Sequence, residues 1–461
     1  MIMANKDSFY LQLEKIFIEN QMYKQPWFEN APSIEELIDR TKKELEDHME
    51  GVYSISDDYI QKLLSIKNSY IAHYDGSKLE FEVVKDHIRN ILFEKKVGFK
   101  SISYEIGPVV TLYKIRLEDN VRMEKIHKIE SYIRLELGVT GVRILAPVPR
   151  MDRVVGIEVP NKQPQPITMD SIWNSSRWQN ESKMTLPVTL GRSTSGEVFM
   201  FDLAKAPHVL IGGTCGTGKS VTVNAIIASL LHKKKPSELK LVLVDPKKVE
   251  FAPYKPLGSS YLDAFPEIDK EDAIIYDCDT LIDALILLVT EMENRYALLM
   301  DAGARDIISY NEMIISHQLN TDRLVGQDLR HHYLPYIVTI IDEYGDFMMQ
   351  AGKIVEFYIG RITQKARAVG MHMILTTQRP SVNIVTGMIK ANFPTRIALR
   401  TQSIIDSRTI IDSKGAEQLN GRGDMIFLDS YYDITRVQGA YMSEEEVDKM
   451  VSDIYKSSSK E

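Results

Sequence analysis

The residues most clearly arranged for chemistry form a glycine-rich loop that ends in a lysine and a serine. Glycines let the backbone wrap closely around phosphates, and the N–H groups at the start of a following helix point toward them. In such a loop the lysine reaches the β- and γ-phosphates and the serine hydroxyl holds Mg²⁺. The pattern G-x-x-x-x-G-K-S therefore predicts a site for ATP and Mg²⁺. Its residues are Gly213, Thr214, Cys215, Gly216, Thr217, Gly218, Lys219 and Ser220, with Val221 directly after them.

The residues on both sides of this loop predict the elements that such a site requires. The apolar run His208–Ile211 precedes the loop and predicts a buried strand, and Val221–Leu231 has the length and apolar stripe of a helix. A glycine turn before an ordinary core helix would also fit the loop residues alone. The order of strand, loop and helix favours the phosphate-binding interpretation.

A nucleotide loop of this kind needs acidic side chains at a second strand end, to orient Mg²⁺ and to polarise water. The run Tyr336–Ile341 predicts a buried strand, and Asp342 and Glu343 follow it. We interpret Asp342 as the carboxylate that reaches the metal and its water shell, and Glu343 as the base for the attacking water. The simpler interpretation, in which two acids merely end a strand, is disfavoured by the loop upstream.

Two further strand ends carry polar side chains near this predicted site. Asp245 follows the apolar run Leu241–Val244, but Pro246 comes next, and we expect Asp245 to face the nucleotide or a subunit edge. Gln378 follows the run His372–Thr377 and is a candidate for sensing the γ-phosphate or orienting water. Many strands end in a polar residue without such a role, so from the residues alone both interpretations of Gln378 stay open.

Charge, cysteine content and hydropathy narrow the class of protein. The chain has 461 residues, a net charge of −8 and two cysteines. An acidic chain is no passive basic coat for DNA or anionic lipid, and two cysteines form no disulfide framework. The N-terminus lacks the apolar segment of a signal peptide, and the apolar runs are too short to cross a bilayer. We expect a globular, cytoplasmic protein without membrane insertion.

Changes in residue pattern divide the chain into five segments. The first is polar, and its Ser33 and Glu36 have the spacing of a helix start. The second mixes a helix at 83–95, strand patterns and a helix at 121–137. In the largest segment strands alternate with helices, which predicts an α/β fold with a mainly parallel sheet. The predicted segments are a helical region at 1–80, a small α/β module at 83–173, a linker at 174–185, a nucleotide-binding domain at 186–447 and a tail at 448–461. The strands predicted in the module are 100–105 and 109–117, which form a hairpin, and 142–148 and 154–159.

Several long stretches carry a more specific signal, because they occur together in a fixed order. Besides the loop they are VLVDPKKVEF (242–251), EMENRYALLMDAGARDIISYN (291–311), IIDEYGDFMM (340–349), QKARAVGMHMILTTQRPSVNIVTGMIKANFPTRIALR (364–400), IDSRTIID (405–412), GAEQLNGRGDM (415–425) and RVQGAYMSEEEV (436–447). Through these stretches the chain resembles the FtsK/SpoIIIE family of ring-forming, ATP-driven translocases of double-stranded DNA, and the likeness covers roughly residues 83–450.

The resemblance implies a RecA-like P-loop ATPase motor domain that forms a homo-oligomeric, hexameric ring. It assigns Lys219 and Ser220 to phosphate and Mg²⁺, Asp342 and Glu343 to metal and water activation, and Gln378 to sensing. Ring ATPases also need a cation from the neighbouring subunit to stabilise the transferring phosphoryl group. Arg367 is our first candidate for that cation, ahead of Arg396 and Arg408; the alternative is that Arg367 is an ordinary solvated arginine.

Local charge predicts where DNA would bind. Residues 361–423 contain ten Lys and Arg against three acids, a net of +7 within a chain whose total is −8. Such a cluster suits a channel that follows the phosphate backbone without reading sequence. By resemblance, Arg379, Lys390 and Arg408 are the candidates for DNA contact. The alternative is that these charges form ion pairs at subunit interfaces.

Some features depart from the family. Ile404 stands where family members often carry a lysine, and residues 1–80 have no counterpart, so we expect them to bind an unidentified protein partner. The membrane helices and the terminal DNA-reading module of full-length members are not seen in this sequence. A coupling or packaging ATPase of a conjugation, plasmid or phage system is therefore an alternative. A nucleotide-gated DNA-binding clamp is a second one, although Glu343, Gln378 and Arg367 together argue for hydrolysis.

Overall fold

The computed structural model describes Lys43 and residues 79–458, apart from short gaps at 140, 146–147, 149–150, 152, 263–272, 323, 326–328 and 430–433. The predicted helix start at Ser33 and most of the region assigned to a protein partner lie outside the described residues. The chain divides after Tyr104 into two compact units. The first contains helix α5 (Leu79–Glu94) and most of strand β1 (Phe99–Ile106).

The second unit begins with a small antiparallel sheet. Its strands are β2 (Val110–Leu117), β3 (Arg143–Leu145) and β4 (Val154–Pro160), and β4 pairs with both others. The single helix predicted at 121–137 is in fact two, α6 (Met123–Lys128) and α7 (Glu130–Leu137). The break falls at Ile129, whose backbone is not helical, and Ile126 and Ile133 on its two sides are both fully buried.

A nine-stranded mixed sheet forms the centre of the second unit, as expected for a RecA-like α/β fold. The spatial order is β6-β5-β15-β14-β13-β7-β12-β11-β8. The strands are β5 (Pro187–Ser193), β6 (Val198–Asp202), β7 (His208–Gly212), β8 (Leu239–Val244), β11 (Tyr336–Ile341), β12 (Met371–Thr377), β13 (Thr395–Leu399), β14 (Asp424–Leu428) and β15 (Thr435–Gly439). A separate small hairpin pairs β9 (Leu324–Val325) with β10 (Leu329–Arg330).

The strands from β13 to β8 are parallel and form the half of the sheet that carries the predicted site. Every residue of β7, β11 and β12 is buried, which agrees with their near-continuous apolar runs. The other half, from β14 to β6, is antiparallel. The prediction of a mainly parallel sheet is therefore correct for the half from β13 to β8 and does not describe the antiparallel half from β14 to β6.

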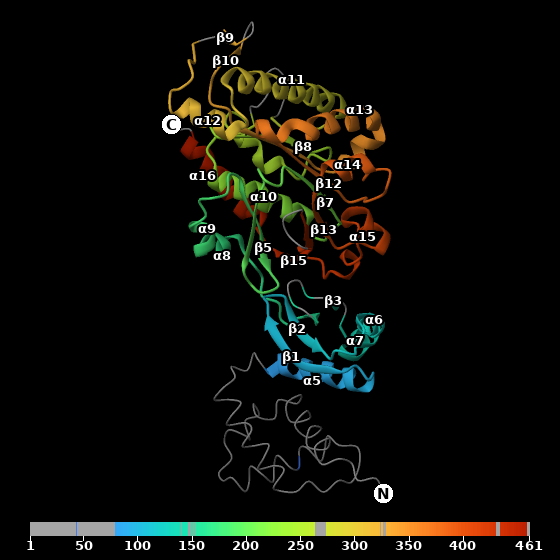
Figure 1. The fold of residues 1–461 in the computed structure, drawn as a ribbon. Helices are drawn as coiled ribbons and strands as arrows, with labels where there is room; N and C mark the ends of the chain where they lie inside the picture. Colours follow the sequence, from blue (N-terminus) through green and yellow to red (C-terminus); the bar gives the residue numbers. More distant parts are fainter. Residues whose placement is uncertain are drawn as a thin grey trace. The chain divides into compact units, whose positions relative to one another are not determined.

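Helices cover both faces of this sheet (Figure 1). The connection from β7 to β8 runs toward the β8 edge of the sheet, and the connections from β8 to β11 and on to β12 run back. Because crossovers between parallel strands are right-handed, connections that run in opposite directions place their helices on opposite faces. In Figure 1, α11 and α13 lie side by side on one face and α10 lies with α16 on the other. The helices are α8 (Met169–Trp173), α9 (Ser176–Gln179), α10 (Lys219–Lys233), α11 (Cys278–Ala302), α12 (Ile307–Ile315), α13 (Tyr344–Lys365), α14 (Gly387–Asn392), α15 (Ile404–Ile411) and α16 (Glu444–Ser458), with 3₁₀ turns η2 (Ala252–Leu257), η3 (Ala366–Val369) and η4 (Ala416–Gln418).

The strands and helix predicted around the phosphate loop are confirmed, with ends that differ by at most two residues. The predicted linker and tail both contain helix, because Trp178 in α9 and Val451 in α16 are buried apolar anchors. None of the described helices is long and apolar enough to span a membrane.

Candidate nucleotide-binding site

The phosphate loop joins the carboxyl end of β7 to the first turn of α10 and is fastened to the neighbouring strands. Gly213 N donates to Thr377 O at the end of β12 (3.2 Å), and Thr214 N donates to Arg400 O just after β13 (3.0 Å). Both contacts are between backbone atoms, and they fix the start of the loop against the ends of β12 and β13. The sheet thus presents the loop at its carboxyl edge, where ligands of parallel α/β sheets bind.

The second half of the loop is held by the backbone at Gly423 and Gly439, which packs closely against it. Gly423 N donates to Thr217 O (2.8 Å), and Gly439 N donates to Gly423 O (2.7 Å). Gly218 has φ +108°, and a Cβ there would lie 2.6 Å from Gly423 N. A side chain at Gly218 is therefore excluded by space as well as by backbone conformation.

Lys219 is buried and lies directly against the acidic strand end. Its ammonium pairs with Asp342 Oδ1 and donates to Thr376 Oγ1 (3.1 Å). Thr376 Oγ1 in turn donates to Asp342 Oδ1 (2.6 Å). The other carboxylate oxygen, Asp342 Oδ2, is buried and has no hydrogen-bond partner among the described residues. A buried carboxylate oxygen without a partner is costly unless a ligand completes its environment.

Glu343 follows directly and is held in an unusual conformation. Its φ and ψ are 43° and 52°, the left-handed region that a residue with a side chain rarely adopts. Its carboxylate accepts from Thr377 Oγ1 (2.9 Å) and from Gln378 N (3.0 Å). The left-handed turn directs the Glu343 side chain toward the end of β12, beside Asp342 and the phosphate loop.

The structure brings together the site residues predicted near the loop. Lys219, Asp342, Glu343 and Gln378 lie at adjacent strand ends, and Gln378 binds Glu343 through its backbone N–H. Asp245 differs from the expectation. Its buried carboxylate accepts from Lys247 N (3.0 Å) and Phe251 N (3.2 Å), so it shapes its own loop.

Four residues of this site were not predicted from the sequence. Thr376 and Thr377 bind the two acids, Glu250 accepts from Ser220 Oγ (2.7 Å), and Lys247 lies 3.8 Å from Glu343. The two threonines had a signal, because they are adjacent polar residues that end an otherwise apolar strand. Glu250 and Lys247 had none beyond their position after a strand.

Arg367 lies at the opposite edge of the sheet from the phosphate loop of its own chain. It stands in η3, just before the amino end of β12, whereas the loop follows the carboxyl end of the parallel strand β7. Buried Arg295 of α11 supports this turn by donating to Val369 O (3.0 Å). Arg367 is exposed, and it therefore does not join the site built by its own chain.

The three candidate DNA-binding residues have different surroundings. Arg379 and Arg408 are exposed and form no ion pair among the described residues. Lys390 is half-buried and pairs with Asp412, which also pairs with Arg396. Lys390 Nζ also lies 3.4 Å from Arg408 O, so α14 and α15 are adjacent at this point.

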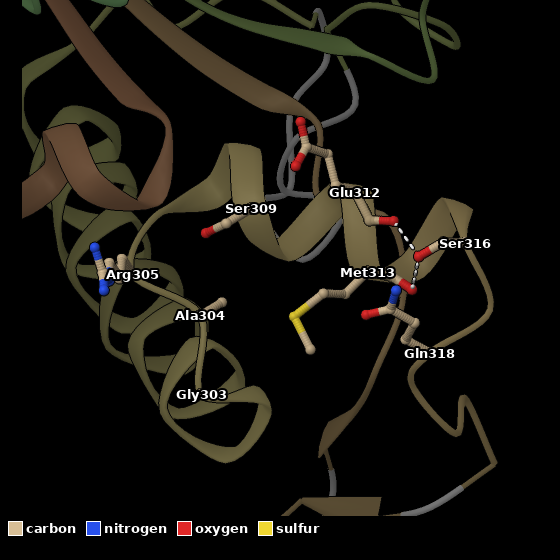
Figure 2. A pocket seen from close by; sticks show the side chains of 8 residues that line it. All are labelled: Gly303, Ala304, Arg305, Ser309, Glu312, Met313, Ser316 and Gln318. Atoms are coloured by element: carbon tan, nitrogen blue, oxygen red, sulfur yellow. Dashed lines mark hydrogen bonds between the residues drawn. The ribbon is translucent and has the colours of Figure 1, made fainter.

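A shallow surface hollow lies elsewhere, between the end of α11 and α12. Figure 2 shows Met313 extending from α12 toward the loop that carries Ala304, with Arg305 nearby. None of the predicted site residues lines it, and we assign it no function.

Comparison with known proteins finds similarity to the FtsK/SpoIIIE family in both parts of the chain. The model of the FtsK/SpoIIIE family matches residues 169–382, and the model of the FtsK alpha domain matches residues 62–161. The DNA translocase FtsK of Chlorobaculum tepidum is 41% identical over 367 residues, which are 79% of this chain and 43% of that protein. The DNA translocase SftA of Bacillus subtilis is 43% identical over 349 residues, 76% of this chain and 34% of that protein. The chain thus spans less than half the length of these curated relatives.

A solved structure supports the fold. The conjugation coupling protein TcpA of pCW3, solved as a monomer with ATPγS, aligns with a TM-score of 0.52 at 22% identity. The alignment covers 80% of this chain and 99% of TcpA. At this identity the likeness concerns the arrangement of helices and strands and carries no residue roles.

Proposed function

We propose that this chain, which belongs to the FtsK/SpoIIIE family, is an ATP-hydrolysing motor that moves double-stranded DNA in the cytoplasm. One observation carries the proposal. Lys219, Asp342 and Glu343 meet at the end of a phosphate loop, and the buried Asp342 Oδ2 lacks a hydrogen-bond partner among the described residues. A site built in this way binds the phosphates of ATP and supplies a base for water.

The residues of the site divide the work of hydrolysis. The loop amides and Lys219 bind the phosphates, and Glu343 accepts a proton from the attacking water. Asp342 and the Ser220 hydroxyl fit Mg²⁺, because hard cations prefer oxygen ligands and Asp342 Oδ2 is buried without a partner among the described residues. When bound, Mg²⁺ neutralises the charge that develops on the β- and γ-phosphates. Gln378 lies beside Glu343 and is proposed to sense the γ-phosphate.

Arg367 is proposed to act on a neighbouring subunit. It lies at the opposite sheet edge from its own phosphate loop, so it can meet a phosphate loop only across an interface. A ring in which each subunit supplies Arg367 to the next would satisfy this requirement, and six subunits is the number that the family resemblance implies. The site on one chain would then be completed by the next chain.

Double-stranded DNA is proposed to contact the basic segment that contains Arg379, Lys390 and Arg408. Arg379 and Arg408 are exposed and form no ion pair with an acid among the described residues. Contacts of this kind bind the phosphate backbone and give no sequence preference. Such binding suits a motor that must follow DNA of any sequence.

The test is ATP turnover with and without duplex DNA, together with displacement of a triplex-forming strand. We expect duplex DNA to stimulate turnover and the wild type to displace the third strand. Lys219→Ala and Asp342→Ala should abolish both activities. Turnover that does not depend on DNA would contradict the DNA part of the proposal. Turnover well below about one per minute with DNA present would instead favour a nucleotide-gated clamp.

A further inference from the structure

The loop between β8 and η2 is fixed by its own residues. Asp245 begins it, and the Asp245 carboxylate accepts from Lys247 N (3.0 Å) and Phe251 N (3.2 Å), one near each end of the loop. Asp245 N itself donates to Ile275 O (2.8 Å). Phe251 closes the loop and is only 1% exposed. The fold of this loop is therefore secured without the side chain of Glu250.

This loop presents two charged side chains to the nucleotide site. Glu250 Oε1 accepts a hydrogen bond from Ser220 Oγ (2.7 Å). Lys247 Nζ lies 3.8 Å from Glu343 Oε2. One short loop thus contacts both the hydroxyl proposed to hold Mg²⁺ and the carboxylate proposed to activate water.

The contact with Ser220 determines how its hydroxyl is oriented. A serine hydroxyl has one proton and two lone pairs. When the proton is donated to Glu250, the lone pairs are directed away from the carboxylate and are free for a cation. Mutation of a group that holds a metal ligand in this way typically weakens metal binding about 10- to 100-fold.

We propose that Glu250 is a positioning residue for Mg²⁺: it fixes the proton of Ser220 so that the hydroxyl oxygen faces the metal beside Asp342. The inference rests on the proposed function, because it concerns the same ATP site. The unpartnered Asp342 Oδ2 supplies the second, independent sign that a cation belongs there. The carboxylate of Glu250 also adds negative charge close to the metal, which further favours binding.

The experiment measures nucleotide binding and not turnover. A fluorescent ATP analogue is titrated into the full chain in EDTA, and Mg²⁺ is then titrated at a fixed nucleotide concentration. In Glu250→Ala we expect the Mg²⁺ concentration for half-maximal effect to rise about 10-fold or more. In Glu250→Gln the amide oxygen still accepts from Ser220, so we expect a smaller rise. The affinity in EDTA should stay at the wild-type value in both variants.

Glu445→Gln is the matched control, because it removes an exposed carboxylate at the start of α16. An unchanged Mg²⁺ requirement in Glu250→Ala would overturn the inference. An equal loss of affinity with and without Mg²⁺ would also overturn it, since that result means Glu250 only supports the loop. A gain of affinity in EDTA would overturn it too, because Glu250 would then compete with the nucleotide. If the wild type itself binds nucleotide without any effect of Mg²⁺, the proposed function fails and not only this inference.

Discussion

Two buried clusters of charge in this molecule differ in how completely their groups are paired. In the nucleotide site, Lys219 pairs with Asp342 and Thr376, while Asp342 Oδ2 has no partner among the described residues. In the second cluster, Arg436 of β15 donates to both oxygens of Asp424 (2.9 and 2.6 Å) and to Glu158 (2.7 Å).

The second cluster joins the small sheet to the large one, because Glu158 belongs to β4 and Asp424 to β14. All three residues are buried. Burial alone would lower the pKa of Arg436, but Asp424 and Glu158 outweigh it and raise that pKa. A cluster whose carboxylates are saturated by cations, here by Arg436 and by Arg143 at 3.6 Å from Glu158, holds structure together. An unsaturated carboxylate such as Asp342 has room for a ligand. The difference predicts that mutation of the first cluster affects chemistry and mutation of the second affects stability.

The largest expected effect is a loss of ATP turnover in Glu343→Gln, next to the unsaturated cluster of Lys219 and Asp342. Glutamine keeps the shape and still accepts from Gln378 N, but it cannot take a proton from water. We expect ATP turnover to fall by about 10²- to 10⁴-fold, while ATP affinity and the thermal midpoint stay unchanged. Steady-state turnover and a thermal shift assay check this. A turnover within ten-fold of the wild type would show that another group is the base.

The next effect is on stability, in Arg436→Met within the saturated cluster. Asp424 would be left buried without its cation and Glu158 would keep only Arg143, 3.6 Å away, at a cost of about 3–5 kcal/mol in the free energy of unfolding. The control is Arg177→Met, which removes an exposed pair with Glu197 and should cost less than about 1 kcal/mol. Denaturant unfolding measures both. Equal losses in the two variants would remove the distinction between the clusters.

A third effect concerns pH and two buried histidines at the amino ends of β7 and β12. Burial lowers the pKa of His208 and of His372 to about 3. Between that value and the ordinary histidine pKa the unfolded chain binds more protons, so stability falls as pH falls below about 6.5. At pH 5 each histidine should reduce the free energy of unfolding by about 2 kcal/mol relative to neutral pH. Unfolding measured from pH 7.5 to 5 checks this, and His372→Phe should flatten the pH dependence.

The smallest expected effect extends the comparison to the proposed DNA surface. Arg408 forms no ion pair among the described residues, whereas Lys390 is already paired with Asp412. Arg408→Ala should weaken duplex binding and reduce the slope of log affinity against log salt by about one. Lys390→Ala should have a smaller effect on both quantities. Fluorescence anisotropy at several salt concentrations measures both the affinity for duplex DNA and its salt dependence. A larger effect of Lys390→Ala would mean that Lys390, and not Arg408, makes the stronger DNA contact.

The sequence predicts the parts of this site that depend on neighbours along the chain. The loop at Gly213–Ser220 and the strands before it and before Asp342 are local patterns of glycine and apolar residues, and the structure confirms their positions. The contact between Ser220 and Glu250 depends on how distant segments pack, and no local pattern reports it. The same holds for the antiparallel half of the sheet and for the edge on which Arg367 lies.

The roles of the predicted residues depend on partners that lie outside the chain. Geometry places Gln378 beside Glu343, but sensing requires a γ-phosphate. Arg367 requires a second subunit, and Arg379, Lys390 and Arg408 require DNA. Their roles and the predicted segment boundaries therefore stay predictions.

Gly218 of the phosphate loop stacks backbone against backbone on Gly423 and Gly439, which lie at the two ends of the β14–β15 hairpin. A Cβ on Gly439 would lie 2.9 Å from Gly423 O, and Gly423 itself has φ +84°. Gly218 and Gly439 cannot gain even one methyl group unless the stack moves, and at Gly423 the left-handed backbone disfavours any side chain. In a library of random substitutions selected for nucleotide binding, these positions should behave as one unit, and glycine should survive at all of them together.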